Sequence, residues 1–183
     1  MDRHCHEEDM KAVVFTLGCK VNSCESASLK SGLEKLGYET SEELSFADLY
    51  IINTCAVTAE AEKKSRQAIA RARKYNPDCK IIVTGCASEK SPKDFLAKNN
   101  VTLVTGAKSK DRILSMLDER GEKFDETDEY YEEYLPAGTD RERAYIKVQD
   151  GCDNFCSYCI IPYRRRQDRV MPASSRTPQH TNH

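Results

Sequence analysis

The chain has 183 residues, enough for one domain with its own hydrophobic core and a remainder, which excludes a minimal scaffold that depends on disulfides for stability. Its 28 Lys and Arg residues nearly balance its 30 Asp and Glu residues, and the net charge of −2 excludes binding to nucleic acid through overall positive charge. No apolar run exceeds four residues, whereas a membrane-spanning helix needs roughly 20, and the first ten residues contain no hydrophobic segment. We therefore expect a cytoplasmic protein that does not enter a membrane.

From residue 11 to residue 118 the chain alternates short apolar runs with amphipathic segments, which is typical of a parallel sheet with crossover helices. Strands are predicted at residues 12–17, 49–53, 80–84 and 101–105, with a weaker one at residues 38–42. Capping residues and helix breakers between these strands predict the helix boundaries. The boundaries are Asn22 and Gly37 for the first helix, Thr58 and Asn76 for the second, Ser91 followed by Pro92 for the third, and residues 109 and 121 for the fourth.

The composition changes after this α/β region. Residues 118–133 contain nine acidic and two basic residues, which predicts a solvated linker. An apolar run at residues 144–148 predicts one more strand, and the last twenty residues have almost no apolar periodicity. The predicted divisions are a disordered N-terminus (1–10), an α/β domain (11–118), an acidic linker (119–142), a cysteine-containing segment (143–163) and a disordered tail (164–183).

Cysteine is the most informative residue type in the chain. Nine cysteines occur without an export signal, and thiols at this density in a reducing compartment are more often ligands or catalysts than disulfides. Cys19, Cys55 and Cys86 each follow a predicted strand within two residues. Because the carboxyl ends of parallel strands share one edge of a sheet, we expect these three thiols to converge there.

Three thiolates at one edge predict a site for a soft metal. The fourth strand repeats the pattern with Ala107 where a further cysteine would stand, so the site keeps one position open for a ligand that is not protein. The alternative is that each cysteine is only a small buried residue at a strand end, where free cysteine is common.

A second set of cysteines lies in the loop after the predicted strand at residues 144–148. Cys152, Cys156 and Cys159 have the spacing C-x3-C-x2-C, and three closely spaced thiolates suit an iron–sulfur cluster with one open iron. Structural zinc is the alternative, but a closed zinc site needs a fourth cysteine or histidine, and the closest downstream histidines lie in the predicted tail. Phe155 and Tyr158 are predicted to shield the cluster or contact a bound cofactor, or simply to cover the loop.

At these residues the sequence resembles the radical S-adenosylmethionine methylthiotransferases. The C-x3-C-x2-C motif followed by IIPY is similar to the signature of their radical domain, and TLGCKVN, INTCAVT and VTGC are similar to the three ligand segments of their N-terminal domain. The resemblance covers residues 11–163. GCKVN looks like the branch that modifies threonylcarbamoyladenosine next to the tRNA anticodon, rather than the isopentenyladenosine or ribosomal-protein branches.

The resemblance implies a flavodoxin-like N-terminal domain and two 4Fe–4S clusters. One cluster, on Cys152, Cys156 and Cys159, would bind S-adenosylmethionine, with Tyr158 as a further contact, and cleave it to a radical that abstracts hydrogen from C2 of the target adenine. The other cluster would carry the inserted sulfur. Its implied ligands are Cys19, Cys55 and Cys86. The implied partners are tRNA and a reductant protein, and the implied state is a monomer.

The chain departs from this family after the second cysteine set. A complete (β/α)8 barrel takes about 200 residues or more, yet only 38 residues follow Tyr145. The segment after IIPY resembles nothing in the family. We therefore expect a truncated, inactive form that contains only the first strand and cluster loop of the radical domain. Two other classes remain open, namely a non-catalytic iron–sulfur or sulfur-carrier protein and a structural zinc protein.

Overall fold

Five parallel strands form the central sheet of the protein. The computed structural model describes residues 10–107, 110–117, 147, 149–165 and 169–170. The strand order is β2-β1-β3-β4-β5, and every neighbouring pair is parallel. The strands are β1 (Lys11–Thr16), β2 (Glu39–Ser41), β3 (Leu49–Thr54), β4 (Lys80–Gly85) and β5 (Val101–Val104). This order confirms the predicted flavodoxin-like α/β class.

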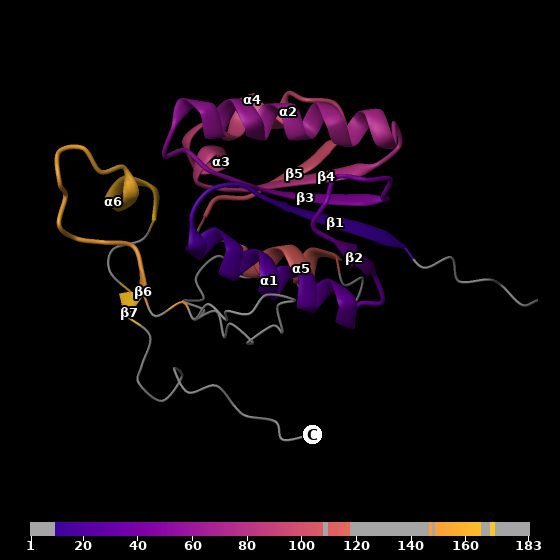
Figure 1. Ribbon diagram of the computed structural model, residues 1–183, viewed down its shortest axis with the longest axis horizontal. Helices are drawn as coiled ribbons and strands as arrows, with labels where there is room; N and C mark the ends of the chain where they lie inside the picture. Colours follow the sequence, from indigo (N-terminus) through magenta and orange to yellow (C-terminus); the bar gives the residue numbers. More distant parts are fainter. Residues whose placement is uncertain (1–9, 108–109, 118–146, 148, 166–168, 171–183) are drawn as a thin grey trace, which may run out of the picture.

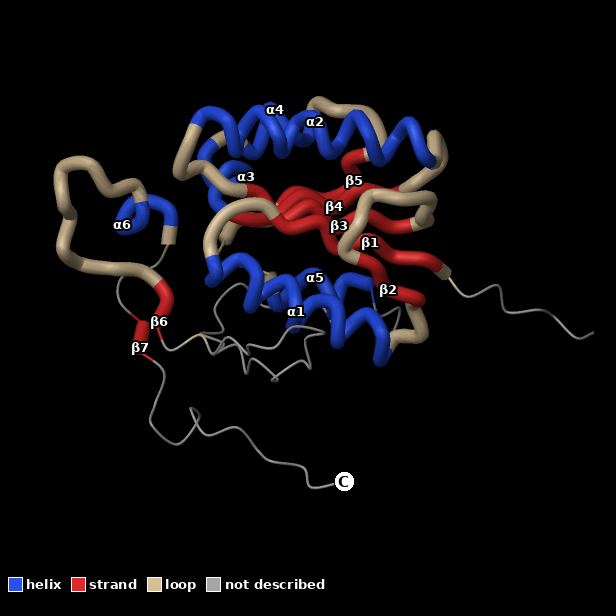
Figure 2. The backbone as a smooth tube through the Cα atoms, in the orientation of Figure 1, coloured by secondary structure: helices blue, strands red, loops and turns tan. Residues whose placement is uncertain are grey.

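Helices cover both faces of the sheet, so the domain has three layers (Figure 1). The helices of the α/β domain are α1 (Lys20–Lys35), α2 (Ala59–Tyr75), α3 (Cys86–Lys90), α4 (Pro92–Leu96) and α5 (Asp111–Leu117). Figure 2 shows α1 and α5 on one face, and α2, α3 and α4 on the other. No helix in the described ranges combines the length and the apolarity that crossing a bilayer would require.

The core consists of two clusters, one under each helical layer, because side chains alternate between the two faces of a strand. In β3, Tyr50 and Ile52 join the cluster that packs against α2. Leu49 and Ile51 of the same strand join the cluster that packs against α1 and α5. All six residues of β3 are buried, as expected for the central strand of a sheet covered on both faces.

The predicted end of the first helix, both ends of the second and the start of the third are confirmed, while the predicted ends of the last helix, residues 109 and 121, lie outside the described residues. The Thr58 hydroxyl accepts a hydrogen bond from Ala61 N at 3.1 Å, and α2 ends just before Asn76. Gly37 follows α1 with a φ of +88°. The prediction that Asn22 caps α1 is wrong, because the helix begins at Lys20 with Cys19 as its N-cap. The short helix α3 was not predicted, since its five residues are too few to show a period.

A small C-terminal segment lies beside the end of the sheet from which α1 and α3 begin (Figure 1). It comprises β6 (Gln149–Asp150), the cysteine loop, α6 (Ile161–Arg164) and β7 (Arg169–Val170), which pairs antiparallel with β6. The predicted strand at 144–148 lies mostly outside the described residues. The predicted linker at 119–142, nearly all of the predicted N-terminus at 1–10 and most of the predicted tail at 164–183 also lie outside them.

Candidate functional site

The structure brings Cys19, Cys55 and Cys86 to one edge of the sheet. They follow β1, β3 and β4, which are neighbours, and the strand ends are in register, with Thr54 opposite Gly85. Cys19 is the N-cap of α1, and Cys86 is the first residue of α3. We call this edge, with its three cysteines, the rim. Its third loop is as short as it can be, because α3 starts directly after β4.

Two glycines allow the rim loops to approach one another closely. Gly18 has a φ of +109°, and a Cβ there would lie 2.8 Å from Cys55 Sγ. Gly85 has a φ of +102°, and a Cβ there would lie 2.3 Å from the backbone oxygen of Thr54. A side chain at either position would be strained by the backbone and would also displace the neighbouring loop. The glycines directly before Cys19 and Cys86 therefore set the spacing of the rim.

Asn22 holds two of the rim loops from inside α1. Its amide nitrogen donates to Leu17 O at 2.7 Å and to Thr54 O at 3.1 Å. These carbonyls lie close before Cys19 and Cys55 in the sequence. In turn, the Asn53 amide donates to Asn22 O at 3.1 Å. Asn22 is fully buried, and its role as a connector between strands replaces the predicted role as a helix cap.

The three rim thiols differ in their surroundings. Cys19 is exposed, whereas Cys55 and Cys86 are buried. Burial raises the pKa of the Cys86 thiol, while the charges of Arg165 and Lys110 act in the opposite direction. The backbone N–H of Val57 donates to Cys55 Sγ at 3.5 Å. Positive charge and backbone donors are the features that stabilise thiolates as metal ligands.

A buried network of charged side chains lies next to the rim, and no motif in the sequence predicts it. We call it the Glu25 network. Its members are Glu25, Lys110, Lys147, Asp150 and Arg165. Glu25 is 1% exposed and accepts from Lys110, Lys147 and Arg165. The members are separated by up to 140 residues, and no local spacing or motif signals them.

The charges of the network hold Glu25 ionised. Burial alone would raise the pKa of the carboxyl, but Lys110, Arg165 and Lys147 outweigh it and lower the pKa from 4.5 to about 2. Arg165 donates to Glu25 Oε1 and to Asp150 Oδ1, both at 2.7 Å. It lies at the start of the segment predicted to be disordered, yet it is only 4% exposed. Its ion pairs come from distant elements, which composition cannot reveal.

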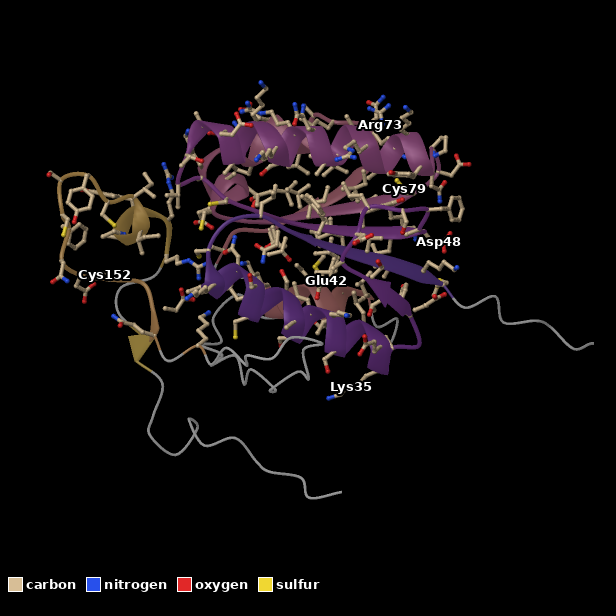
Figure 3. All side chains as sticks on the ribbon, viewed as in Figure 1. Lys35, Glu42, Asp48, Arg73, Cys79 and Cys152 are labelled. Carbon is tan, nitrogen blue, oxygen red and sulfur yellow. The ribbon has the colours of Figure 1, made fainter. Side chains whose placement is uncertain are left out.

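The second cysteine set lies in the loop between β6 and α6. The backbone N–H of Cys159 donates to Cys156 O at 2.9 Å, so the C-x2-C portion forms a tight turn. Phe155 has a φ of +46° and packs edge to face against Tyr163, with ring centroids 5.7 Å apart. Tyr158, the predicted cofactor contact, is 90% exposed. Figure 3 shows Cys152 in this segment, at the opposite end of the sheet from Cys79.

Neither cysteine set is closed around a metal in this structure. Within the described part of the chain, no three cysteine, histidine or carboxylate side chains lie close enough to hold one ion. The donor types and the shared edge nevertheless fit an iron–sulfur cluster, because three thiolates can hold such a cluster with one iron left open. Asn53 Oδ1, buried without a hydrogen-bond partner, lies 2.7 Å from the position of a Cβ on Gly85, so this loop has no room for a larger residue.

Comparisons with known proteins agree with the fold. Residues 11–106, slightly more than half of the chain, match the model described as uncharacterized protein family UPF0004. The threonylcarbamoyladenosine tRNA methylthiotransferase MtaB of Bacillus subtilis is 42% identical over 85% of this chain and 37% of its own length. That of Chlamydia pneumoniae is 43% identical over 86% of this chain and 36% of its own length.

A relative with another name also matches. The tRNA-2-methylthio-N(6)-dimethylallyladenosine synthase of Thermosipho africanus is 36% identical over 87% of this chain and 38% of its own length. The chain thus spans about two fifths of the length of the curated relatives it matches. It belongs to the UPF0004 family, which forms the N-terminal domain of the tRNA methylthiotransferases.

Proposed function

We propose that this chain is the cluster-bearing part of a tRNA methylthiotransferase that acts on threonylcarbamoyladenosine next to the anticodon. The observation that carries the proposal is the meeting of two cysteine sets at one end of one sheet. Cys19, Cys55 and Cys86 reach this end as strand termini. The loop with Cys152, Cys156 and Cys159 reaches it through the Glu25 network.

In this proposal the rim holds one 4Fe–4S cluster and the loop holds another. When bound, the loop cluster with S-adenosylmethionine supplies radical chemistry and the rim cluster supplies the sulfur. The protein contributes placement. Gly18 and Gly85 let the rim loops meet, and Asn22 keeps two of them at a fixed separation. Arg165 and Lys110 add positive charge beside Cys86, which favours the thiolate form that iron binds.

Tyr158 suits the role of a cofactor contact because its ring is exposed on the loop, whereas Phe155 is engaged with Tyr163. We assign Phe155 to shaping the loop and Tyr158 to contacting S-adenosylmethionine. The test is binding of S-adenosylmethionine to the anaerobically reconstituted protein. Tyr158→Ala should weaken binding several-fold, and Tyr75→Ala, at an exposed tyrosine on α2, is the control.

Anaerobic reconstitution with iron and sulfide tests the two clusters. The unchanged chain should take up two clusters, Cys55→Ser should lose one, and Cys156→Ser should lose the other. Cys79→Ser is the control, since Cys79 is a buried cysteine at the opposite end of the sheet. Loss of both clusters from a folded single variant would show that the six ligands are divided wrongly. Zinc without acid-labile sulfide would support a structural zinc protein.

A radical methylthiotransferase and a non-catalytic iron–sulfur or sulfur-carrier protein differ in one reaction product. A radical enzyme forms 5′-deoxyadenosine from S-adenosylmethionine when reduced, whereas an iron–sulfur or sulfur-carrier protein binds iron and forms none. For the substrate, the test is deletion of the gene. Loss of the methylthio group from threonylcarbamoyladenosine in total tRNA would assign the protein to this branch, whereas an unchanged level would agree with the inactive form that the sequence predicts. Loss from isopentenyladenosine instead would assign the chain to the other tRNA branch. The relatives named for threonylcarbamoyladenosine, at 36–43% identity, favour the first outcome.

A further inference from the structure

We propose that Arg165 is a positioning residue that docks the C-terminal cysteine loop onto the rim and fixes the arrangement of the rim at the same time. The docking contact is defined by the Glu25 network. The statement that both cysteine sets hold clusters rests on the proposed function, but the docking itself does not.

The guanidinium of Arg165 forms hydrogen bonds both with the α/β domain and with its own C-terminal segment. Toward the α/β domain, it donates to Glu25 Oε1 at 2.7 Å and Oε2 at 3.3 Å, a two-pronged pairing with fixed orientation. Toward its own segment, it donates to Asp150 Oδ1 at 2.7 Å. Lys147 reinforces the same bridge, because it donates to Glu25 Oε1 at 3.0 Å and to Asp150 Oδ2 at 2.8 Å. Two carboxylates and two cations therefore link β6 and the end of α6 to α1.

Arg165 also contacts the residue that supports two of the three rim cysteines. Its second terminal nitrogen donates to Asn22 Oδ1 at 2.7 Å. The amide nitrogen of Asn22 in turn donates to Leu17 O and Thr54 O, the carbonyls that precede Cys19 and Cys55. The connection through Asn22 does not extend to the third cysteine, Cys86, which Arg165 influences only through its nearby charge. One side chain thus connects the cysteine loop to two of the three rim loops.

Burial distinguishes this contact from an ordinary surface ion pair. The side chains of Glu25, Lys147 and Arg165 are 1%, 5% and 3% exposed. Buried charges are expensive to desolvate, so such networks contribute little net stability but make any other arrangement costly. A network of this kind defines one docked geometry. In contrast, the pair between Arg66 and Glu62 on α2, in which the arginine side chain is 46% exposed, has no such effect.

Hydrogen exchange on the cluster-free chain tests the docking. Arg165→Leu should speed exchange of the backbone amides of residues 159 and 165 by about tenfold or more. Both amides are hydrogen-bonded within the C-terminal segment. Amides of β1, β3 and β4 should keep their protection. Arg165→Lys should restore part of the protection because it retains the charge, and Arg66→Leu should change nothing. Should Arg165→Leu unfold the chain, Lys147→Leu removes the other direct contact between the C-terminal segment and Glu25. Unchanged exchange in both variants would overturn the docking.

A spectroscopic readout tests the positioning role. In a variant with Cys152, Cys156 and Cys159 all changed to Ala, only the rim cluster can form on reconstitution. We expect Arg165→Leu in this background to shift the electron paramagnetic resonance signal of the reduced rim cluster, and Arg165→Lys to shift it less. An unchanged signal, together with lost docking, would reduce Arg165 to a structural residue. Failure of the rim cluster to form with Arg165 intact would contradict the proposed function, while the exchange experiment would still decide the docking.

Discussion

The two cysteine sets reach the same end of the sheet by different routes. The rim cysteines are 31 to 36 residues apart and meet only because β1, β3 and β4 are neighbours in a parallel sheet. The loop cysteines are three or four residues apart and are neighbours by sequence alone. Folding of the α/β domain therefore places the first set, whereas docking through the Glu25 network places the second. Two of the rim thiols are buried in the fold, while Cys156 is exposed.

This comparison shows where each set is vulnerable. A change in the sheet or its glycines should disturb the rim and leave the loop spacing intact. A change in the Glu25 network should move the loop without altering its internal spacing. Glu25 accepts from Lys110 of the α/β domain and from Lys147 and Arg165 of the C-terminal segment, so its replacement should have the largest effect of any change in the network.

Glu25→Gln is expected to have the largest effect. It leaves Lys110, Lys147 and Arg165 buried without their shared carboxylate. Removal of one partner from a buried ion pair typically costs about 3–5 kcal/mol, and we expect a loss of this size in the free energy of unfolding. Urea denaturation followed by circular dichroism measures it.

Glu34→Gln is the matched control, because Glu34 is an exposed carboxylate on the same helix whose partner is the Thr40 hydroxyl. It should cost less than about 1 kcal/mol. Equal losses in the two variants would show that the Glu25 network does not hold the two regions together.

Gly85→Ala should disturb the rim next most strongly. Its Cβ would meet the Thr54 carbonyl at 2.3 Å, on a backbone with a φ of +102°, and both the clash and the strain oppose it. We expect a loss of about 2–4 kcal/mol in unfolding free energy. Gly37→Ala separates the two causes, since Gly37 has a φ of +88° but nothing within 4 Å. It should cost only about 1–2 kcal/mol, and a cost equal to that of Gly85→Ala would argue against the close approach of the rim loops.

The sequence predicts the three rim cysteines better than it predicts the Glu25 network. Strand ends followed by cysteines are local patterns, and the parallel topology that joins them follows from the alternation of strands and helices. Glu25 and Arg165 carry no such pattern: one lies on a helix as an ordinary polar residue, the other in a run of arginines. Asparagine favours the N-cap position, which predicts Asn22 as a helix cap, but its buried hydrogen bonds to two strand ends outweigh this local preference.

The Glu25 network should make stability depend on pH at low pH. The pKa of Glu25 in the folded protein is about 2, below its ordinary value of 4.5. Its ionisation therefore stabilises the fold fully above about pH 4.5, and this stabilisation is lost as the pH falls toward 2. The difference in unfolding free energy between the unchanged chain and Glu25→Gln should shrink by about 2 kcal/mol between pH 6 and pH 3. A difference that stays constant over this range would mean that Lys110, Lys147 and Arg165 do not surround an ionised carboxylate.

Thiol reactivity in the cluster-free protein compares the two sets directly, with the smallest expected effect. Cys156 is exposed on a loop, so a thiol reagent reaches it in the native state. Cys86 is 3% exposed, and burial raises the pKa of its thiol, so it reacts only after a local opening of the rim. An opening that costs about 1.4 kcal/mol already slows the reaction tenfold, and we expect at least that difference in rate between Cys156 and Cys86. Mass spectrometry after brief alkylation measures each site.

Cys19, an exposed member of the rim, decides what the difference means. Fast alkylation of Cys19 with slow alkylation of Cys86 would show that burial, and not membership of the rim, controls access to the thiol. Equal rates at Cys86 and Cys156 would contradict the prediction, because they would show that the rim does not protect Cys86 from the reagent.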